Sequence, residues 1–341
     1  MKEHSTYIKY LFSITLILIL PAIALSIHYE PLSGDLTRLG YLSENNYGWN
    51  KKQPVQIIFP NPTSKFPEIL VIGDSFSYGN VWQSHIKEKY QKNFLTIRWS
   101  DLKNQSSCYF EYLKKSYPSL KSVMFETVEM GAVGKLIETS EIIQKPCKFK
   151  PSKPFIKQPK KFKTENLRNK NGFIKDPVFL YKTFLNQFKI EEEIKTSSKT
   201  YILKLKNKDL FSHVNSEYGL FYRNAINDKK AWKIIDINRA IDASELIKDH
   251  LKNHNLESLF LLIPDKSTAY QEQIISKDII YKNQILDRLK YDKSFISVID
   301  EFKKLVANEI DFYLSNDTHL STLGYKHMGE IIFNKSLISE N

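Results

Sequence analysis

Short apolar runs alternate with amphipathic stretches over residues 66–143. Residues 68–73 form an apolar run that ends in glycine, which is typical of a buried strand in a parallel sheet. Residues 81–90 have a helical pattern, and two further apolar runs follow at residues 94–99 and 122–126. This order of strand, helix and strand predicts a parallel sheet that is covered by helices.

The same alternation resumes near residue 236, so we expect one α/β domain built from residues 66–143 and 236–341. Residues 144–235 lie between the two halves and are expected to form an insertion. In the second half we expect helices over residues 240–253, 277–289 and 324–333, and strands over residues 259–263 and 295–299.

The longest uncharged apolar stretch lies near the N-terminus. Residues 11–27 carry no charge, and their length is at the short end of what crosses a bilayer. Lys2 and Lys9 precede this stretch, which predicts that the N-terminus stays inside while the rest of the chain is exported. We therefore expect a signal anchor over residues 1–29. A cleavable signal peptide is the alternative, because residues 22–24 (Ala-Ile-Ala) offer a cleavage site.

Two other regions differ in composition from the α/β halves. Residues 30–65 are polar, aromatic and rich in turn residues, so we expect a segment draped over the domain rather than a part of its core. Residues 144–175 contain ten lysines, one arginine and four prolines against a single acidic residue, which argues against a helix. This basic stretch fits either a solvated surface loop or an electrostatic contact with an anionic membrane or glycan.

The charge balance of the whole chain is basic. It has 50 Lys and Arg residues against 38 Asp and Glu residues, a net charge of +12, which favours anionic partners. No zinc-finger spacing, ribonucleoprotein aromatic motif or basic heptad is present, so nucleic-acid binding is not expected. Cys108 and Cys147 are the only cysteines, and they fit either one disulfide in an oxidising compartment or two buried thiols.

Residues 73–76, Gly-Asp-Ser-Phe, follow the first predicted strand and precede a helix. Glycine permits a tight turn there, and Ser75 would stand at the carboxyl edge of the sheet with its backbone N–H directed toward incoming negative charge. This arrangement predicts a nucleophilic serine whose own N–H is an oxyanion donor. Asp74 is expected to order the turn. Helix capping by Ser75 or Asp74 is the non-catalytic alternative.

A second motif, Asp-Thr-His at residues 317–319, lies in a loop before the last predicted helix. Asp317 can turn to the same side of an extended loop as His319 and accept a hydrogen bond from one imidazole nitrogen, while the other nitrogen faces Ser75. We therefore expect His319 to be the general base and Asp317 to orient it. The two motifs together predict a Ser–His–Asp site in one exported α/β domain.

These motifs resemble those of the SGNH hydrolase superfamily, with the Asp-Thr-His motif following the serine motif as in ordinary SGNH proteins. The resemblance is closer to the SGNH-like domains of alginate O-acetyltransferases, and it covers roughly residues 66–143 and 236–335. The further stretches that carry it are residues 125–129 (Phe-Glu-Thr-Val-Glu), residues 261–266 (Leu-Leu-Ile-Pro-Asp-Lys) with Tyr270, and Gly324 after the histidine motif.

The resemblance implies a flavodoxin-like, three-layer α/β fold and transfer of acetyl groups to hydroxyls of an exported or cell-envelope polysaccharide. It implies no cofactor and no metal, and it places a single-pass protein in a bacterial inner membrane with its catalytic domain in the periplasm. Gly131 or Asn80 would supply a further oxyanion donor. Because one span cannot carry an acetyl donor across a membrane, a multispanning acyltransferase is the expected donor partner. A carbohydrate acetylesterase and a non-catalytic glycan-binding or assembly protein are the alternatives.

Several other polar or aromatic residues are weaker candidates. Asp265 and Lys266 follow a strand at the sheet edge where ligands bind, although an ordinary turn explains them equally well. Aromatic side chains could stack on sugar rings, but packing is the simpler interpretation. The two histidines outside the motif are expected to be structural, and the residues in these two groups are His85 and His327, and Trp49, Tyr78 and Trp82.

Overall fold

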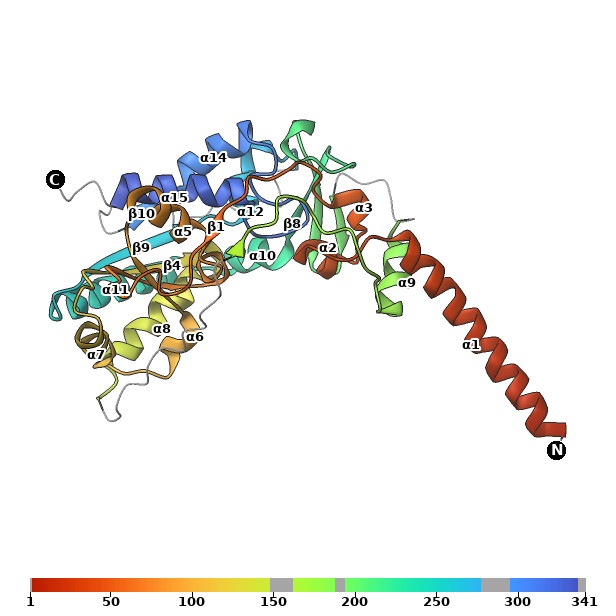
Figure 1. Cartoon of the computed structure of the whole chain (residues 1–341), viewed down its shortest axis with the longest axis horizontal. Helices are drawn as coiled ribbons and strands as arrows, with labels where there is room; N and C mark the ends of the chain where they lie inside the picture. The colour runs from red at the N-terminus through yellow and green to blue at the C-terminus, as the bar shows by residue number, and fades with distance from the viewer. Residues whose placement is uncertain (1, 148–161, 188–193, 277–294, 337–341) are drawn as a thin grey trace.

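A five-stranded parallel sheet forms the centre of the structure (Figure 1). This computed structural model describes residues 2–147, 162–187, 194–276 and 295–336. The strand order is β10-β9-β4-β2-β3. Each strand lies where an apolar run predicted one: β2 (Ile69–Gly73), β3 (Phe94–Arg98), β4 (Ser122–Val128), β9 (Glu257–Ile263) and β10 (Phe295–Ser297).

Helices cover both faces of this sheet, so the chain has the expected α/β architecture with a mostly parallel central sheet. Successive side chains of β4 enter opposite cores: Val123 and Phe125 face one layer of helices and Met124 faces the other. The first layer holds α6 (Trp99–Lys103), α7 (Tyr109–Ser116), α8 (Ala132–Gln144) and α11 (Ile234–Lys252), and the second holds α5 (Val81–Tyr90), α14 (Ile299–Asn308) and α15 (Thr322–Ser336).

The predicted helix boundaries differ from the observed ones in the second half of the domain. Helix α11 begins at Ile234 rather than at residue 240, because its first turn lies in the polar stretch that leads out of the insertion. The helix expected over residues 277–289 lies outside the described residues. Helix α15 begins at Thr322, two residues before the expected start, and it closes the described part of the chain.

The N-terminal helix α1 (Lys2–His28) extends away from the rest of the molecule (Figure 1). Its residues 4–28 form a helix of 25 residues with a mean hydropathy of 2.4, long and apolar enough to cross a membrane. The side chains of this apolar stretch are largely exposed, as expected for a helix surrounded by lipid rather than by protein.

The segment that follows α1 is more buried than its polar composition suggested. It contains α2 (Asp35–Gly40), α3 (Glu44–Tyr47) and β1 (Ile57–Ile58). Leu36 and Tyr47 pack in a buried cluster with Ile202 and Leu220 of the insertion. The segment is therefore part of a packed core and not only a surface strap, because its few apolar residues all point into this cluster.

The described part of the insertion is folded against both the core and the N-terminal segment. Its antiparallel sheet β6-β7-β8 sends Leu203 and Phe221 into the core of the α/β domain. The basic stretch is described from residue 162, where β5 pairs with β1. The remaining elements are β5 (Phe162–Lys163), α9 (Pro177–Asn186), β6 (Ile194–Ser197), β7 (Thr200–Lys204), β8 (Tyr218–Tyr222), α10 (Arg223–Ala231), α4 (Ser75–Tyr78), α12 (Lys266–Ala269) and the 3₁₀ turns η1 (Glu129–Gly131), η2 (Lys208–Leu210) and η3 (Gln271–Gln273).

The two cysteines are joined. Cys108, at the start of α7, forms a disulfide with Cys147, which follows α8, and the two residues are 39 positions apart in the sequence. Of the two alternatives left open by the sequence, the structure therefore contains the disulfide.

Candidate active site

Ser75 is exposed at the first turn of α4, directly beyond the carboxyl end of β2. Gly73 is required for this turn, since a Cβ atom there would come within 2.7 Å of Glu126 Oε2 and 2.5 Å of Ser77 Cβ. Asp74 caps the helix, because its Oδ1 accepts a hydrogen bond of 3.0 Å from the Phe76 N–H. Capping is thus the role of Asp74, and the Ser75 hydroxyl is left for other chemistry.

The second oxygen of Asp74 fixes the turn to the neighbouring strand. Asp74 Oδ2 accepts from the Val128 N–H and from Lys135 Nζ, each at 3.0 Å. The Asp74 N–H in turn donates to Glu126 Oε2 at 3.0 Å. Burial, with the nearby charge of Asp74, raises the pKa of Glu126 well above its ordinary value, so this carboxyl is protonated at neutral pH. Two strand ends are thereby locked beside Ser75.

The two predicted motifs meet at hydrogen-bonding distance. His319 Nε2 lies 2.7 Å from Ser75 Oγ, and His319 Nδ1 lies 2.6 Å from Asp317 Oδ1. The same Asp317 oxygen accepts from the His319 N–H at 3.0 Å, which folds the short loop into a tight turn. The His319 ring also packs on Phe76, with 5.0 Å between the ring centroids. The structure thus brings together the three residues expected to form the Ser–His–Asp site.

The electrostatics of the pair suit a base and its orienting carboxylate. Burial alone would raise the pKa of Asp317, but its hydrogen bond to His319, the charge of His319 and the Asp35 and His319 N–H groups hold it at about 2. Burial would likewise lower the pKa of His319, whereas its contact with Asp317 raises it above 6.5. Asp317 is therefore ionised at neutral pH, and His319 titrates in or above the neutral range.

The loop that carries Asp317 is held by the segment that follows the membrane helix. The Asp35 N–H donates to Asp317 Oδ2 at 3.0 Å, and the Leu36 N–H donates to the Asn316 carbonyl at 2.9 Å. Gly34 lies so close to Asn316 that a Cβ atom would come 2.1 Å from its carbonyl oxygen. A residue 282 positions away in the sequence therefore supplies one of the donors that keep Asp317 ionised.

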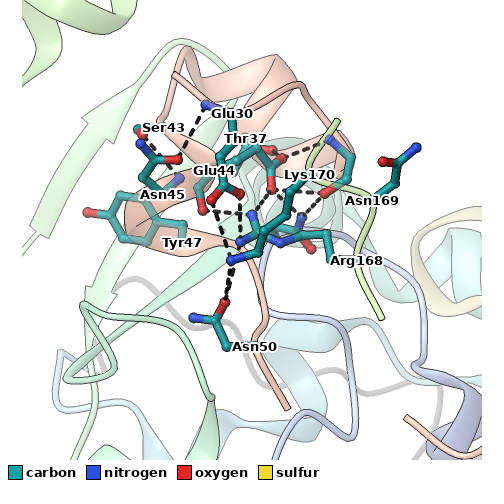
Figure 2. A network of polar contacts seen from close by, with 12 residues as sticks. Glu30, Thr37, Ser43, Glu44, Asn45, Tyr47, Asn50, Arg168, Asn169 and Lys170 are labelled. Atoms are coloured by element: carbon teal, nitrogen blue, oxygen red, sulfur yellow. Dashed lines mark hydrogen bonds and ion pairs between the residues drawn. The ribbon is translucent and has the colours of Figure 1, made fainter. Parts of the chain in front are cut away.

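Glu44 is the centre of a buried polar network in this region (Figure 2). Its side chain is fully buried, and its Oε2 accepts from Asn316 Nδ2 at 2.7 Å and from Arg168 NH1 at 2.9 Å. Its Oε1 accepts from the Ser33 and Gly34 N–H groups, each at 3.1 Å, and from the Thr37 hydroxyl. Glu44 therefore joins the N-terminal segment, the basic stretch and the loop before Asp317.

Arg168, the one arginine of the basic stretch, is not solvated. Its side chain is 3% exposed, and its NH2 lies 2.9 Å from Glu30 Oε2 while its NH1 also donates to the Glu44 carbonyl at 2.8 Å. Figure 2 shows the guanidinium between these carboxylates and Asn50. Part of the basic stretch thus supports the candidate site from below, whereas residues 148–161 lie outside the described residues.

Lys266 holds the other side of the same loop. Its buried Nζ donates to the carbonyls of Leu314, Ser315 and Asp317 at 2.7, 2.9 and 3.2 Å. Burial lowers the pKa of Lys266 to about 7, although the charges of Asp317 and Asp311 act in the opposite direction. Of the two interpretations of Lys266, a loop-positioning role fits these contacts better than an ordinary turn.

Asp265 belongs to a second buried cluster beside the site. Lys229 Nζ lies 3.2 Å from both Asp265 Oδ2 and Glu129 Oε2, and it donates to Thr268 Oγ1 at 2.8 Å. Burial raises the pKa of Asp265 to about 7, while Lys229 opposes this rise. The cluster ties α10 to the carboxyl ends of β4 and β9.

A cavity of about 220 Å³ opens beside Ser75. An engineered apolar cavity of about 150 Å³ holds benzene, so this space suffices for a small acyl group or part of a sugar ring. Its walls are mostly apolar, and Lys266 and Thr318 are among its polar lining. The apolar lining residues are Leu39, Phe76, Val128, Met130, Tyr222 and Ala225.

The further oxyanion donors suggested by the sequence do not line this cavity. Asn80 is 2% exposed, and its amide is engaged elsewhere: Nδ2 donates to the Phe59 carbonyl at 3.5 Å, and Oδ1 accepts from Thr96 Oγ1 at 2.8 Å. Gly131 ends the turn before α8, against the Lys135 side chain. The prediction for Asn80 is therefore wrong in this structure, because its amide completes the packing of the 59–96 region, and Gly131 gains no support.

The weaker candidates lie away from the Ser75 contact. His85 Nε2 lies 2.6 Å from Glu330 Oε1 and His327 Nε2 lies 3.9 Å from Glu309 Oε1, so both histidines pair with carboxylates on the helical layer. Trp82 is fully buried and Trp49 is 9% exposed, as expected for packing, and Tyr78 stacks under the Arg98 guanidinium at 3.5 Å.

A group of ligand-type atoms is present within the described residues. Asp35, Asp317 and His319 each place one such atom within 4.8 Å of the others. Because the His319 nitrogens are already directed at Asp317 and Ser75, the arrangement is that of a hydrogen-bonded relay.

Sequence reasoning missed Glu44, Arg168 and Asn316, and it left the role of Lys266 open. The available signals were weak: one arginine in a lysine-rich run, and an acidic residue placed between apolar positions at 42 and 47. In comparisons with known proteins, no protein-family model, curated sequence or solved structure matches this chain.

Proposed function

We propose that this chain is a membrane-anchored serine O-acyltransferase, with acetyl as the expected acyl group and a hydroxyl of an exported or cell-envelope polysaccharide as the acceptor. The observation that carries the proposal is the contact of 2.7 Å between His319 Nε2 and Ser75 Oγ, with Asp317 2.6 Å behind the imidazole. The assignment to an SGNH type of fold, and the location on the outer side of a bacterial inner membrane, are parts of this proposal.

The reaction follows from the three side chains. Ser75 Oγ attacks the acyl carbonyl of the donor while its proton passes to His319 Nε2. The tetrahedral intermediate collapses, the leaving oxygen of the donor takes the proton from His319, and the acyl group remains as an ester on Ser75. A sugar hydroxyl then gives its proton to His319 and attacks this ester, which releases the acylated sugar and returns the proton to Ser75. Asp317 stays ionised throughout, in keeping with its low pKa.

Negative charge develops on the acyl oxygen in both tetrahedral intermediates. The Ser75 N–H, at the first position of α4, is the donor that the turn places nearest to this charge. Asp74 engages the next N–H, that of Phe76, and so keeps the turn in one conformation. The apolar side of the cavity excludes water from the acyl group, which favours transfer over hydrolysis.

The acceptor and the donor are proposed from charge and anchoring. A net charge of +12 attracts polyanionic glycans, and one membrane helix cannot carry a donor across the bilayer. A multispanning partner would therefore deliver the acyl group. If the chain in liposomes without other membrane proteins acylated its glycan as fast as native membranes do, no partner would be needed.

Hydrolysis is the second candidate function, because Ser75 is exposed and water can reach an ester on it. The residues would be the same, so this alternative is a carbohydrate acetylesterase. A soluble sugar acceptor separates the two functions: a transferase diverts acetyl from water to sugar, so that acetylated sugar replaces free acetate as the acceptor concentration rises.

The decisive test is acetyl-ester turnover by the detergent-solubilised full chain. Ser75→Ala and His319→Ala should each lower kcat by at least about 10³-fold, since loss of either residue disables the relay. Ser100→Ala, on the exposed side of α6, and His327→Ala are matched controls that should keep full turnover. Turnover that survives both site substitutions would overturn the proposed mechanism.

A further inference from the structure

Helix α9 of the insertion packs against the membrane helix. Tyr181 OH donates to the Leu18 carbonyl at 2.8 Å. Phe179 and Leu180 are buried in a cluster against which Ala22 and Leu25 of α1 pack. Figure 1 shows α9 beside the end of α1 that is nearest to the body of the molecule. The insertion therefore touches α1 within its apolar stretch and not only at its end.

The level of this contact places α9 at membrane depth. Leu18 lies ten residues before His28, the last residue of α1, and at a rise of about 1.5 Å per residue this is roughly 15 Å along the helix. A bilayer has a hydrocarbon core of about 30 Å, so a spanning α1 puts the stretch from Leu18 to Ser26 in the leaflet on the side of the folded domain. Helix α9 lies beside that stretch.

The outer face of α9 suits hydrocarbon. Val178, Phe184 and Leu185 are 56%, 40% and 58% exposed, and Phe173, which precedes the helix, is 69% exposed. The one charge within the helix, Lys182, lies 4.4 Å over the Tyr41 ring and 3.3 Å from its hydroxyl, on the side of α2. In water, such a group of apolar side chains would be unfavourable, and its continuity with α1 indicates what covers it.

A groove runs between the two helices. Its volume is about 440 Å³, and its walls are almost entirely apolar. Lys175 lies on its lining, where an ammonium group suits a lipid phosphate. The groove is lined by Leu18, Ile19, Ala22, Ile23 and Ser26 of α1 and by Ile174, Pro177, Val178, Leu180 and Tyr181 of the insertion.

The backbone of α9 also meets the demands of an apolar medium. Asp176 Oδ1 accepts from the Val178 and Phe179 N–H groups at 2.9 and 3.2 Å, and Pro177 has no N–H to satisfy. At the other end the Gln187 N–H donates to the Phe184 carbonyl at 3.2 Å. Satisfied helix ends are what a helix in lipid requires.

We propose that α9, with Phe173, enters the bilayer leaflet beside α1 and that lipid acyl chains fill the groove between the two helices. This inference rests on the anchor in the proposed function but not on its chemistry. Two membrane contacts fix the orientation of the domain where one helix would leave it free to rotate. Since Phe179 of α9 packs on Tyr41 directly after α2, with 5.6 Å between ring centroids, the cavity wall formed by α2 is held close to the membrane surface.

Site-directed spin labelling of the full chain in phosphatidylcholine–phosphatidylglycerol liposomes tests this. The native cysteines are disulfide-bonded, so Leu185→Cys or Val178→Cys adds a single free thiol for the label. Ile17→Cys, 68% exposed on α1, is the lipid reference, and Leu246→Cys, 48% exposed on α11, is the water reference. Collision rates with oxygen, which concentrates in lipid, are compared with those of a water-soluble nickel chelate.

The expected result is that both α9 labels match Ile17→Cys, with a high ratio of oxygen to nickel collisions, and differ from Leu246→Cys. If the α9 labels match Leu246→Cys while Ile17→Cys is in lipid, the inference is overturned and the anchor stands. If Ile17→Cys is also in water, the anchor fails and the inference fails with it. Acetyl-ester turnover of the same labelled proteins reports on the proposed chemistry separately, because none of these positions lines the cavity.

Discussion

Replacing Glu44 by Gln should weaken both the fold and the activity. The substitution removes a fully buried charge from between Arg168, Asn316 and Ser33, and it presents an amide to groups that are themselves donors. Breaking a buried ion pair by neutralising one partner costs about 3–5 kcal/mol, because the other charge stays buried without compensation. Domains of this size are stable by only about 5–15 kcal/mol, so this loss is a large fraction of the total.

The catalytic effect follows from the loop. Glu44 holds Asn316, and Asn316 precedes the aspartate that orients His319. A displacement of about 1 Å at a catalytic group lowers turnover on the order of 10²-fold, which is the fall in kcat expected for Glu44→Gln. KM should change less, because Glu44 does not line the cavity.

The assay is urea unfolding followed by tryptophan fluorescence, together with acetyl-ester turnover. Glu111→Gln is the matched control, since Glu111 is 47% exposed and pairs only with Lys115, so its loss should change the free energy of unfolding by less than about 1 kcal/mol. Glu44→Gln combined with Arg168→Gln should be less destabilised than the sum of the single variants, since no charge is then left unpaired. A Glu44→Gln protein within 1 kcal/mol of wild type, or strictly additive variants, would refute the reasoning.

Three further predictions concern titration, loop support and the disulfide. Because only neutral His319 is a base and its pKa is raised, kcat/KM should fall on the acid side with a midpoint above 6.5, while the stability that protonated His319 contributes is lost as pH rises through that midpoint; a midpoint at or below 6.5 argues against the pairing with Asp317. Lys266→Met should lower kcat about 10²-fold with a smaller change in KM, whereas Lys115→Met, at a side chain that is 75% exposed, should not, as steady-state kinetics will show. Cys108→Ser opens a loop of 39 positions and should cost roughly 2–4 kcal/mol in urea unfolding; a loss below about 1 kcal/mol would mean that the disulfide constrains little.

The sheet could be predicted because its strands are buried on both faces. An apolar run such as residues 69–72 has the same character whatever surrounds it, and the five runs appear in the structure at nearly the expected boundaries. The Ser75 and His319 motifs were equally local, since each combines a turn with a functional side chain. Only their mutual distance required the fold.

The support of the site could not be predicted, because it depends on contacts between distant parts of the chain. Glu44 meets residues 124 and 272 positions away, and neither apolar periodicity nor composition reports such pairings. Composition pointed the other way for Arg168, since a lysine- and proline-rich run normally remains in water. Buried charges of this kind are specified by the few partners that neutralise them, and those partners emerge only with the tertiary structure.

The same contacts bear on how the anchor and the site relate. Helix α1 ends at His28, Glu30 pairs with Arg168, and the Asp35 N–H already donates to Asp317. Seven residues of extended chain reach at most about 25 Å, so the catalytic carboxylate lies within that distance of the point where the chain leaves the membrane helix, give or take the length of one hydrogen bond. A donor or acceptor that stays near the membrane surface can therefore reach Ser75 without a long-range movement of the domain. This proximity favours a membrane-bound source of acyl groups over a freely diffusing one.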